Sequence, residues 1–204
     1  MIKSRLVFAT NNKHKINEIK LAVGDTIDIV TLSELNCFSD IPESNPTLEG
    51  NAIQKARFIY DNFKMNCFAD DTGLEVEALD GRPGVYSARY SEDEFPSLVG
   101  EERSKANINK ILSELLNTKN RKARFRTVIA LIIKGEEILF DGTIHGTIID
   151  NPTGSNGFGY DPVFIPNGYQ NTFAELNIAI KNTISHRAIA IKKLVKYLNS
   201  KDII

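Results

Sequence analysis

Hydrophobic and polar positions along the chain alternate between the spacing of strands and the spacing of helices. Residues 6–8 form a short apolar run, and residues 16–23 carry isoleucine and valine at intervals of three and four. The first pattern is typical of a strand and the second of a helix. The apolar run 27–32 predicts a second strand, and the polar stretch around Pro42 and Pro46 predicts a loop. We therefore expect the chain to open with a strand, a helix and a strand.

A second helix is expected to begin after Thr47, because a threonine side chain can cap the free N–H groups of a helix start. Its apolar face is formed by residues at helical spacing, namely Ala52, Ala56, Ile59 and Phe63. A short strand ending at Asp70 and Asp71 is predicted next. The helix is expected to pack against the sheet to which this strand belongs.

The middle of the chain predicts further strands and one helix. Residues 74–79 are expected to form a strand that is closed by the turn 81–84, and residues 101–116 have the pattern of a helix. Residues 123–133 and 137–149 are rich in β-branched and apolar side chains on either side of a Lys-Gly pair. This arrangement predicts a long antiparallel hairpin.

The end of the chain combines a loop and a terminal helix. Residues 150–161 are rich in glycine, proline and asparagine, and Ser185 is placed to cap a last helix. The whole pattern belongs to the mixed α/β class. No linker or internal repeat interrupts the 204 residues, so we expect one domain, residues 1–204, large enough to bury a core without disulfide or zinc support.

Charge and cysteine content restrict the classes of partner. There are 25 Lys and Arg against 26 Asp and Glu, so no global field favours nucleic acid or a membrane surface. The basic stretch 119–126 is either a solvated turn and strand face or a contact for an anionic ligand. Cys37 and Cys67 suit a reducing compartment. With no apolar run of membrane-spanning length and no signal-peptide core, a cytoplasmic protein without a membrane partner is expected.

The first candidate site is the segment 9–15, directly after the opening strand. A helix start there offers free N–H groups and a positive dipole, and Thr10 or Asn12 can cap it. Lys13 and Lys15 lie in the first turn, where the dipole disfavours cations. A bound anion would reverse that penalty, whereas the alternative is an ordinary capped helix with exposed lysines.

The second candidate site is a set of carboxylates, Glu43, Glu49, Asp70, Asp71 and Glu75. Adjacent strand residues face opposite sides, so only one of the two aspartates is expected to point into a given cleft. Carboxylates that converge need a cation or a shared proton, and oxygen ligands select Mg²⁺ or Mn²⁺. The alternative is a simple Asp-Asp-Thr-Gly turn.

The third candidate site combines the glycine-rich loop 153–161 with Lys181, His186 and Arg187. The loop matches neither a P-loop nor a dinucleotide fingerprint. Its aromatic side chains either stack on a base or belong to the core. His186 and Arg187 follow the cap of the last helix, where they invite a phosphate or a carbonyl oxygen. Metal-assisted hydrolysis of a nucleotide phosphate would use all three sites.

Six segments in order resemble the inosine triphosphate pyrophosphatase family, whose members are also called XTP/dITP diphosphatases. They are Phe8 to Asn12 with Lys15 and Glu18; Glu43, Thr47, Asn51-Ala52 and Lys55-Ala56; Ala69 to Leu74; Pro83 to Tyr90; Gly157 to Pro162; and Ile184 to Arg187. The resemblance runs nearly end to end. It implies an elongated mixed sheet flanked by helices, two lobes with a central nucleotide-binding cleft, and a homodimer.

The activity implied by the resemblance is Mg²⁺-dependent hydrolysis of ITP, dITP or XTP to the monophosphate and pyrophosphate. Asp71 would be the catalytic base with Asp70 assisting, and Glu43 and Asp71 would hold the Mg²⁺ ion. The implied substrate-binding residues are Thr10, Asn11, Asn12, Lys13, His14, Lys15, Asn51, Lys55, Thr72, Phe158, Gly159, Tyr160, Asp161, Lys181, His186 and Arg187. The donors of Arg187 would favour a 6-keto purine over adenine.

One departure from the family pattern concerns Gly50, which stands where the family has an acidic residue and which weakens the first turn of the second helix. A different class of function remains open beside the enzyme: a nucleotide-binding or RNA-binding module without catalysis. Near-neutral charge counts against that module, and it would leave the carboxylates without a task. We therefore expect a small purine nucleoside triphosphate as partner, with no stable binding of nucleic acid.

Overall fold

The computed structural model describes residues 4–24 and 27–201. These residues fold into two compact units. Unit 1 comprises residues 4–24, 27–71, 127–142 and 185–201, and unit 2 comprises residues 72–126 and 143–184. Three long strands supply residues to both units: β3 (Cys67–Val76), β5 (Lys122–Ile133) and β6 (Glu136–Ile148).

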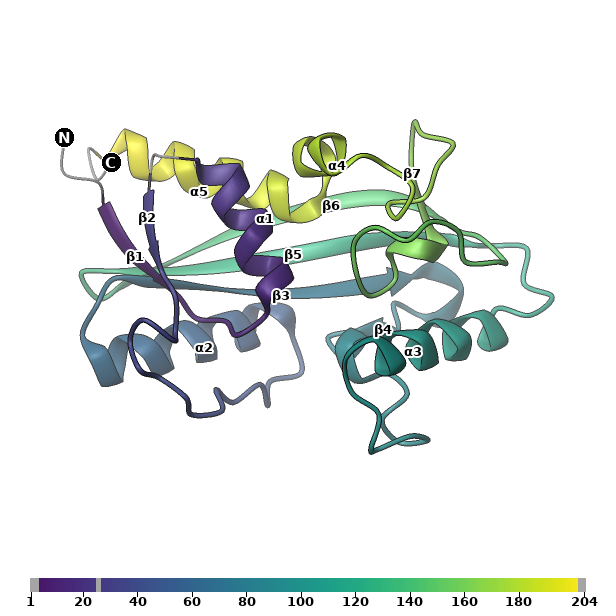
Figure 1. The fold of residues 1–204 in the computed structure, drawn as a ribbon, viewed down its shortest axis with the longest axis horizontal. Helices are drawn as coiled ribbons and strands as arrows, with labels where there is room; N and C mark the ends of the chain where they lie inside the picture. Colours follow the sequence, from purple (N-terminus) through teal and green to yellow (C-terminus); the bar gives the residue numbers. More distant parts are fainter. Residues whose placement is uncertain (1–3, 25–26, 202–204) are drawn as a thin grey trace. The chain divides into compact units, whose positions relative to one another are not determined.

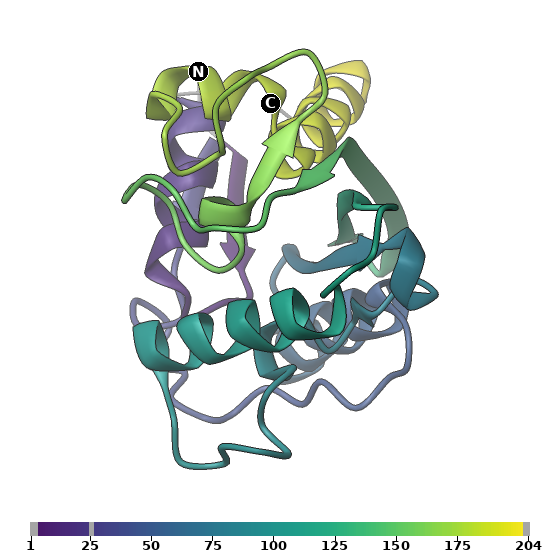
Figure 2. The same ribbon diagram turned by 90° about the vertical axis from the view of Figure 1, so that its right-hand side faces the viewer.

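Unit 1 is a mixed sheet with helices on both faces. Strand β1 (Ser4–Phe8) lies between β2 (Ile27–Val30) and β3 and is parallel to both, and β5 and β6 follow β3. Helices α1 (Lys13–Val23) and α5 (His186–Ser200) cover one face, and α2 (Leu48–Phe63) covers the other (Figures 1 and 2). Side chains that alternate along these strands therefore meet different helices.

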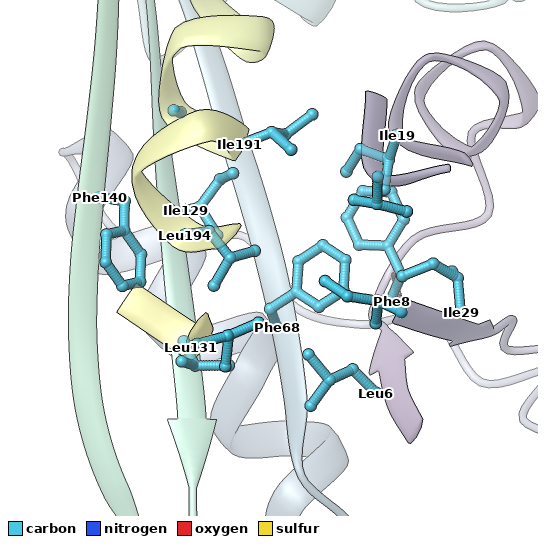
Figure 3. Close-up of a cluster of buried hydrophobic side chains, with 14 of the residues drawn as sticks. Leu6, Phe8, Ile19, Ile29, Phe68, Ile129, Leu131, Phe140, Ile191 and Leu194 are labelled. Carbon is cyan, nitrogen blue, oxygen red and sulfur yellow. The ribbon is translucent and has the colours of Figure 1, made fainter. Parts of the chain in front are cut away.

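The core of unit 1 lies under α1 and α5. Phe8 of β1 and Phe68 of β3 stack with ring centroids 4.6 Å apart, and both are fully buried. Figure 3 shows Ile191 and Leu194 of α5 directed toward the strands, close to Phe68 and Ile129. Because burying an apolar side chain of this size contributes about 1.5–3 kcal/mol, this core fixes α5 on the sheet.

Unit 2 is built on the continuation of the long strands. Strand β4 (Pro83–Gly84) pairs antiparallel with β3, and β7 (Phe164–Pro166) pairs antiparallel with β6. Helices α3 (Gly100–Glu114) and α4 (Ile178–Ile184) complete it. Figure 2 shows α3 in teal and the segment that contains β7 in green. Its core includes the rings of Phe125, Phe164 and Phe173.

Short 3-10 helices lie at Glu77–Leu79, Ser87–Arg89 and Asp161–Val163. Within the ranges that the structure describes, no helix is long and apolar enough to cross a membrane.

The mixed α/β class predicted from the sequence is confirmed, with a mixed sheet flanked by helices. The helix starts are also where the sequence predicts them: Asn12, Thr47 and Ser185 each cap a helix with the side chain. The hairpin is formed by β5 and β6.

The prediction that a strand ends at Asp71 is wrong, and so is the alternative of a turn at Thr72-Gly73. Strand β3 continues without a break from Cys67 to Val76. A glycine is required at position 73 for a different reason than a turn: a Cβ atom at Gly73 would lie 2.4 Å from the carbonyl oxygen of Gly84. Gly73 thus permits β4 to approach β3 closely, which no local pattern reveals.

Two smaller differences concern the end of β2 and the helix α4. Strand β2 ends at Val30, two residues before the predicted end, because the N–H of Thr31 donates to Glu34 Oε2 at 2.6 Å and begins a turn. The short helix α4 was not predicted.

Candidate active site

The first candidate segment forms a capped helix start in unit 1. Asn12 Oδ1 accepts from the N–H of His14 at 2.9 Å and of Lys15 at 3.2 Å, and Thr10 Oγ1 accepts from the N–H of Asn12. No acidic side chain lies in the first turn of α1. Asn11, Asn12, Lys13 and His14 are exposed, so this start keeps a positive, polar surface.

Lys15 differs from the other residues of this segment because its side chain turns inward to Asp70. Its Nζ donates to Asp70 Oδ1 at 2.9 Å. Burial lowers the pKa of Lys15 from its ordinary value, and the charge of Asp70 opposes this effect. The lysine therefore joins the exposed helix start to the buried face of β3.

Asp70 is the centre of a buried ion-pair network. Its second oxygen, Oδ2, accepts from Arg187 Nε at 3.1 Å, and another guanidinium nitrogen of Arg187 donates to Glu18. The Asp70 side chain has no exposed surface, and that of Arg187 is 2% exposed. Burial alone would raise the pKa of Asp70, but the charges of Lys15 and Arg187 outweigh it and hold this pKa well below its usual range.

Asp71 faces the opposite side of β3, toward α2. Its Oδ1 accepts from Lys55 Nζ at 3.0 Å and its Oδ2 from Asn51 Nδ2 at 3.2 Å. Asn51 and Lys55 are four residues apart and share a helix face, as their sequence spacing predicts. Burial raises the pKa of Asp71 from its ordinary value, although Lys55 opposes the rise.

Glu43 joins this group through the same lysine. Lys55 Nζ donates to Glu43 Oε1 at 2.5 Å, so one ammonium lies between two carboxylates. Burial would lower the pKa of Lys55, but the charges of Asp71 and Glu43 outweigh it and raise this pKa. The acidic set predicted from the sequence thus converges in part, since Glu43 and Asp71 come together while Asp70 belongs to the other face.

The loop that carries Glu43 is held to α2 by Asn51 and by Gln54, a residue that sequence reasoning missed. Gln54 Oε1 accepts from the N–H of Ser44 at 3.0 Å and from Asn45 Nδ2 at 2.8 Å, and Asn51 Oδ1 accepts from the N–H of Asn45. A Cβ atom at Gly50 would lie 2.7 Å from Cβ of Asn45. Gly50 is therefore the position where the loop packs against the helix, which offsets its low helix propensity.

Unit 2 also contains a buried ion pair, at the glycine-rich loop. Asp161 Oδ2 accepts from Lys181 Nζ at 2.6 Å and from the N–H of Phe158 at 2.8 Å. The Lys181 ammonium lies 5.1 Å from the centroid of the Phe158 ring. Gly157 has φ of +79°, and a Cβ atom there would lie 2.0 Å from Asp161 Oδ2. Two side chains and a turn with positive φ at a glycine therefore fix this loop.

The remaining predicted residues have different environments. Tyr160 is buried, and its hydroxyl donates to the carbonyl of Ser87 at 2.8 Å, so it belongs to the unit 2 core. Gly159 has φ of +61°, a backbone conformation that favours glycine. Thr72 is half-buried in β3, and His186 is buried at the first position of α5.

Glu18 belongs to the first motif segment, and the sequence pattern gives it no role. It lies three residues after Lys15 in α1, and this spacing is the signal that both share one helix face.

The donor set of Glu43 and Asp71 fits a divalent cation. Among residues 4–24 and 27–201, no group of three or more His, Cys, Asp or Glu side chains is arranged to hold a metal ion. Mg²⁺, however, is commonly bound by one or two carboxylates with water and substrate phosphates completing its shell. A cation, the Lys55 ammonium, already lies between the two carboxylates and shows that they are arranged for positive charge.

The fold of this chain is similar to those of solved Ham1 proteins. The Ham1 protein of Staphylococcus aureus matches with a TM-score of 0.84 and 39% identity, over 97% of this chain and 99% of that one. A HAM1 protein from Coxiella burnetii matches with a TM-score of 0.85 and 34% identity, over the same shares of the two chains.

Sequence comparison agrees with the structural one. The model of the Ham1 family matches residues 6–197, and the chain belongs to this family. The dITP/XTP pyrophosphatase of Flavobacterium johnsoniae is 48% identical over 196 residues, which are 96% of this chain and 98% of that protein. The protein of the same name from Porphyromonas gingivalis is 50% identical over 195 residues, 95% of this chain and 97% of that one. The family resemblance inferred from the six segments is confirmed.

Proposed function

We propose that the protein hydrolyses ITP, dITP and XTP to the nucleoside monophosphate and pyrophosphate, cutting the bond between the α and β phosphates. Membership of the Ham1 family and the names of the relatives support this activity. The structural observation that carries it is the meeting of three cations with the adjacent aspartates of β3: Lys15 and Arg187 on Asp70, and Lys55 on Asp71.

The triphosphate is bound, in this proposal, by the start of α1 and by the two lysines. Thr10 and Asn12 hold the loop before α1, and the exposed residues of its first turn offer polar and positive groups. Lys15 and Lys55 carry positive charge on opposite faces of one strand. Phosphate oxygens are recognised by such combinations of helix start and ammonium groups.

The metal of this reaction is assigned to Glu43 and Asp71, and Mg²⁺ is the ion that their oxygens favour. When bound, it would neutralise charge on the phosphate oxygens and lower the barrier to attack by water. Asn51 fixes one oxygen of Asp71 by its amide, so the carboxylate keeps its orientation.

Asp71 is the proposed general base, which takes the proton of the attacking water at a carboxylate oxygen. Asp70 is a positioning residue, because its carboxylate is fully buried and bound by two cations. It holds Lys15 and Arg187 in place, and its negative charge favours their charged forms.

The purine base is assigned to the loop of unit 2. The Phe158 ring supplies an apolar face that can stack on a base, and Asp161 and Lys181 fix that ring through the loop backbone and the ion pair. Tyr160 holds the loop to the core through Ser87.

Product analysis tests the proposal directly. With ITP and Mg²⁺ we expect inosine monophosphate and pyrophosphate in equal amounts, measured by chromatography and by a coupled pyrophosphate assay. Release of orthophosphate together with inosine diphosphate would contradict it. Initial rates with ITP, XTP, dITP, GTP and ATP would then rank the bases.

Three further features are proposed. A homodimer rests on the family resemblance alone, a cytoplasmic location rests on the cysteine content and the sequence pattern, and the lack of stable nucleic-acid binding rests on the balanced charge. Light scattering coupled to size exclusion tests the first. A titration with single-stranded RNA at two salt concentrations tests the third, because phosphate-driven binding weakens steeply with salt.

A further inference from the structure

Lys55 lies where it blocks the metal position that the proposed function requires. Its Nζ is 2.5 Å from Glu43 Oε1 and 3.0 Å from Asp71 Oδ1, and its side chain is 5% exposed. We propose that Lys55 is an exchangeable internal cation: it neutralises Glu43 and Asp71 when no metal is bound, and it moves away from them when a divalent cation binds. The inference rests on the assignment of the metal to these two carboxylates.

A metal ion and the Lys55 ammonium cannot both lie between Glu43 and Asp71 at these distances. Mg²⁺ binds oxygen at about 2.0–2.1 Å, so an ion held by Glu43 and Asp71 would be in the space that the ammonium now takes. Two cations at such short range repel each other, and burial strengthens the repulsion. A divalent ion therefore binds these carboxylates only as the Lys55 ammonium leaves at least one of them.

The environment of Lys55 explains why a second ligand would favour the exchange. A displaced ammonium loses two charged hydrogen bonds, and a buried charge without a partner is costly. Lys15 already binds Asp70 on the other face of β3, so Asp70 is not an equivalent partner. A triphosphate bound beside α2 would supply new anionic oxygens for the ammonium.

This exchange links metal binding to nucleotide binding. A nucleotide that draws Lys55 toward its phosphates frees Glu43 and Asp71 for the metal, and the metal in turn releases Lys55 for the nucleotide. Such coupling is reciprocal by thermodynamic necessity. The protein without nucleotide is therefore expected to bind divalent cations weakly.

The test uses Mn²⁺ alone as the probe, titrated into nucleotide-free protein and followed by calorimetry or by electron paramagnetic resonance. Lys55→Met is expected to bind Mn²⁺ at least about fivefold more tightly than the unaltered protein. Lys15→Met is the matched control, because it removes an equal charge that does not lie between Glu43 and Asp71; its gain should be clearly smaller. Adding Glu43→Gln to Lys55→Met should abolish the gain. Equal or weaker binding by folded Lys55→Met would overturn the proposal.

A second measurement needs no variant and covers the case in which Lys55→Met does not fold. The unaltered protein is acetylated briefly with and without saturating Mg²⁺, and the modification of individual lysines is read by peptide mass spectrometry. Modification of Lys55 should increase with Mg²⁺, whereas Lys181, buried against Asp161, should not change. Unchanged Lys55 would refute the exchange, and pyrophosphate release from ITP would still show whether the proposed activity holds.

Discussion

Asp70 and Asp71 are neighbours in β3, yet their carboxylates bind lysines on opposite faces of the sheet. Asp70 accepts from Lys15 at 2.9 Å, and Asp71 accepts from Lys55 at 3.0 Å. The alternation of side chains along a strand produces this division, as the sequence predicts. The pKa of Asp70 is lowered and that of Asp71 is raised, so the two adjacent carboxyl groups are suited to different tasks.

Replacing Asp71 by asparagine should affect catalysis far more than folding. The amide keeps the shape and the contact region of the side chain, but it cannot accept a proton or carry the charge that a metal needs. We expect kcat for ITP to fall at least about a hundredfold, as for loss of a general base, with nucleotide binding retained. Steady-state kinetics and a binding titration measure this. Asp61→Asn, on the exposed side of α2, is the control and should leave kcat unchanged; near-normal turnover of Asp71→Asn would refute the assignment.

Replacing Asp70 by asparagine should lower stability. The substitution leaves the buried charges of Lys15 and Arg187 without their shared carboxylate, and breaking a buried pair in this way costs about 3–5 kcal/mol. Urea denaturation at pH 7 measures the free energy of unfolding. A loss below about 1 kcal/mol, the range of exposed pairs, would show that the network does not stabilise the fold.

The contribution of Asp70 to the free energy of unfolding should depend on pH. Because the pKa of Asp70 is lower in the folded protein than its ordinary value of 3.8, the unfolded chain takes up the proton first as pH falls. The stabilisation by Asp70 is therefore complete well above pH 4 and declines as pH falls below about 4. Denaturation at pH 6, 4 and 3 should show the difference between the unaltered protein and Asp70→Asn narrowing at the lowest pH. A constant difference would contradict the lowered pKa.

Gly50→Ala should weaken metal use although alanine favours helices. Its Cβ would overlap Asn45, so the loop that carries Glu43 must shift. We expect the Mg²⁺ concentration for half-maximal activity to rise about fivefold, which corresponds to about 1 kcal/mol. Asp61→Ala places an alanine in the same helix without such an overlap and should leave this concentration unchanged. An identical response of both variants would argue against the role of Gly50 in loop placement.

The family resemblance also implies that Arg187 contacts the purine base, so Arg187→Ala should reduce discrimination between ITP and ATP. The guanidinium has donors only, which suit the 6-keto oxygen of hypoxanthine and not the amino group of adenine. The variant is also expected to lose about 3–5 kcal/mol of stability, because Glu18 and Asp70 lose their shared cation. The ratio of kcat/KM for ITP to that for ATP is the useful measurement, since it does not depend on the fraction of folded protein. An unchanged ratio would remove Arg187 from base selection.

Local patterns in the sequence were sufficient for the helix starts and for the meeting of Asn51 with Lys55, because caps and helical spacing involve residues close in the chain. They did not explain Gly73, because a glycine is required there by the carbonyl of Gly84 on a neighbouring strand. They also gave no role to Glu18, because its partner Arg187 is 169 residues away.

Gln54 was missed for a related reason. Its amide binds the backbone of a loop, at Ser44, and no residue pattern marks such a contact.

The Asp70 network can be completed only after α5 has been synthesised. The network needs Lys15 from α1 and Arg187 from α5, at opposite ends of the polypeptide. A nascent chain still attached to the ribosome before α5 has emerged can give Asp70 only one of its two cations, and the strands of unit 1 remain without Ile191 and Leu194. Premature termination anywhere before α5 would thus yield a polypeptide with an incomplete core and an unbalanced buried charge.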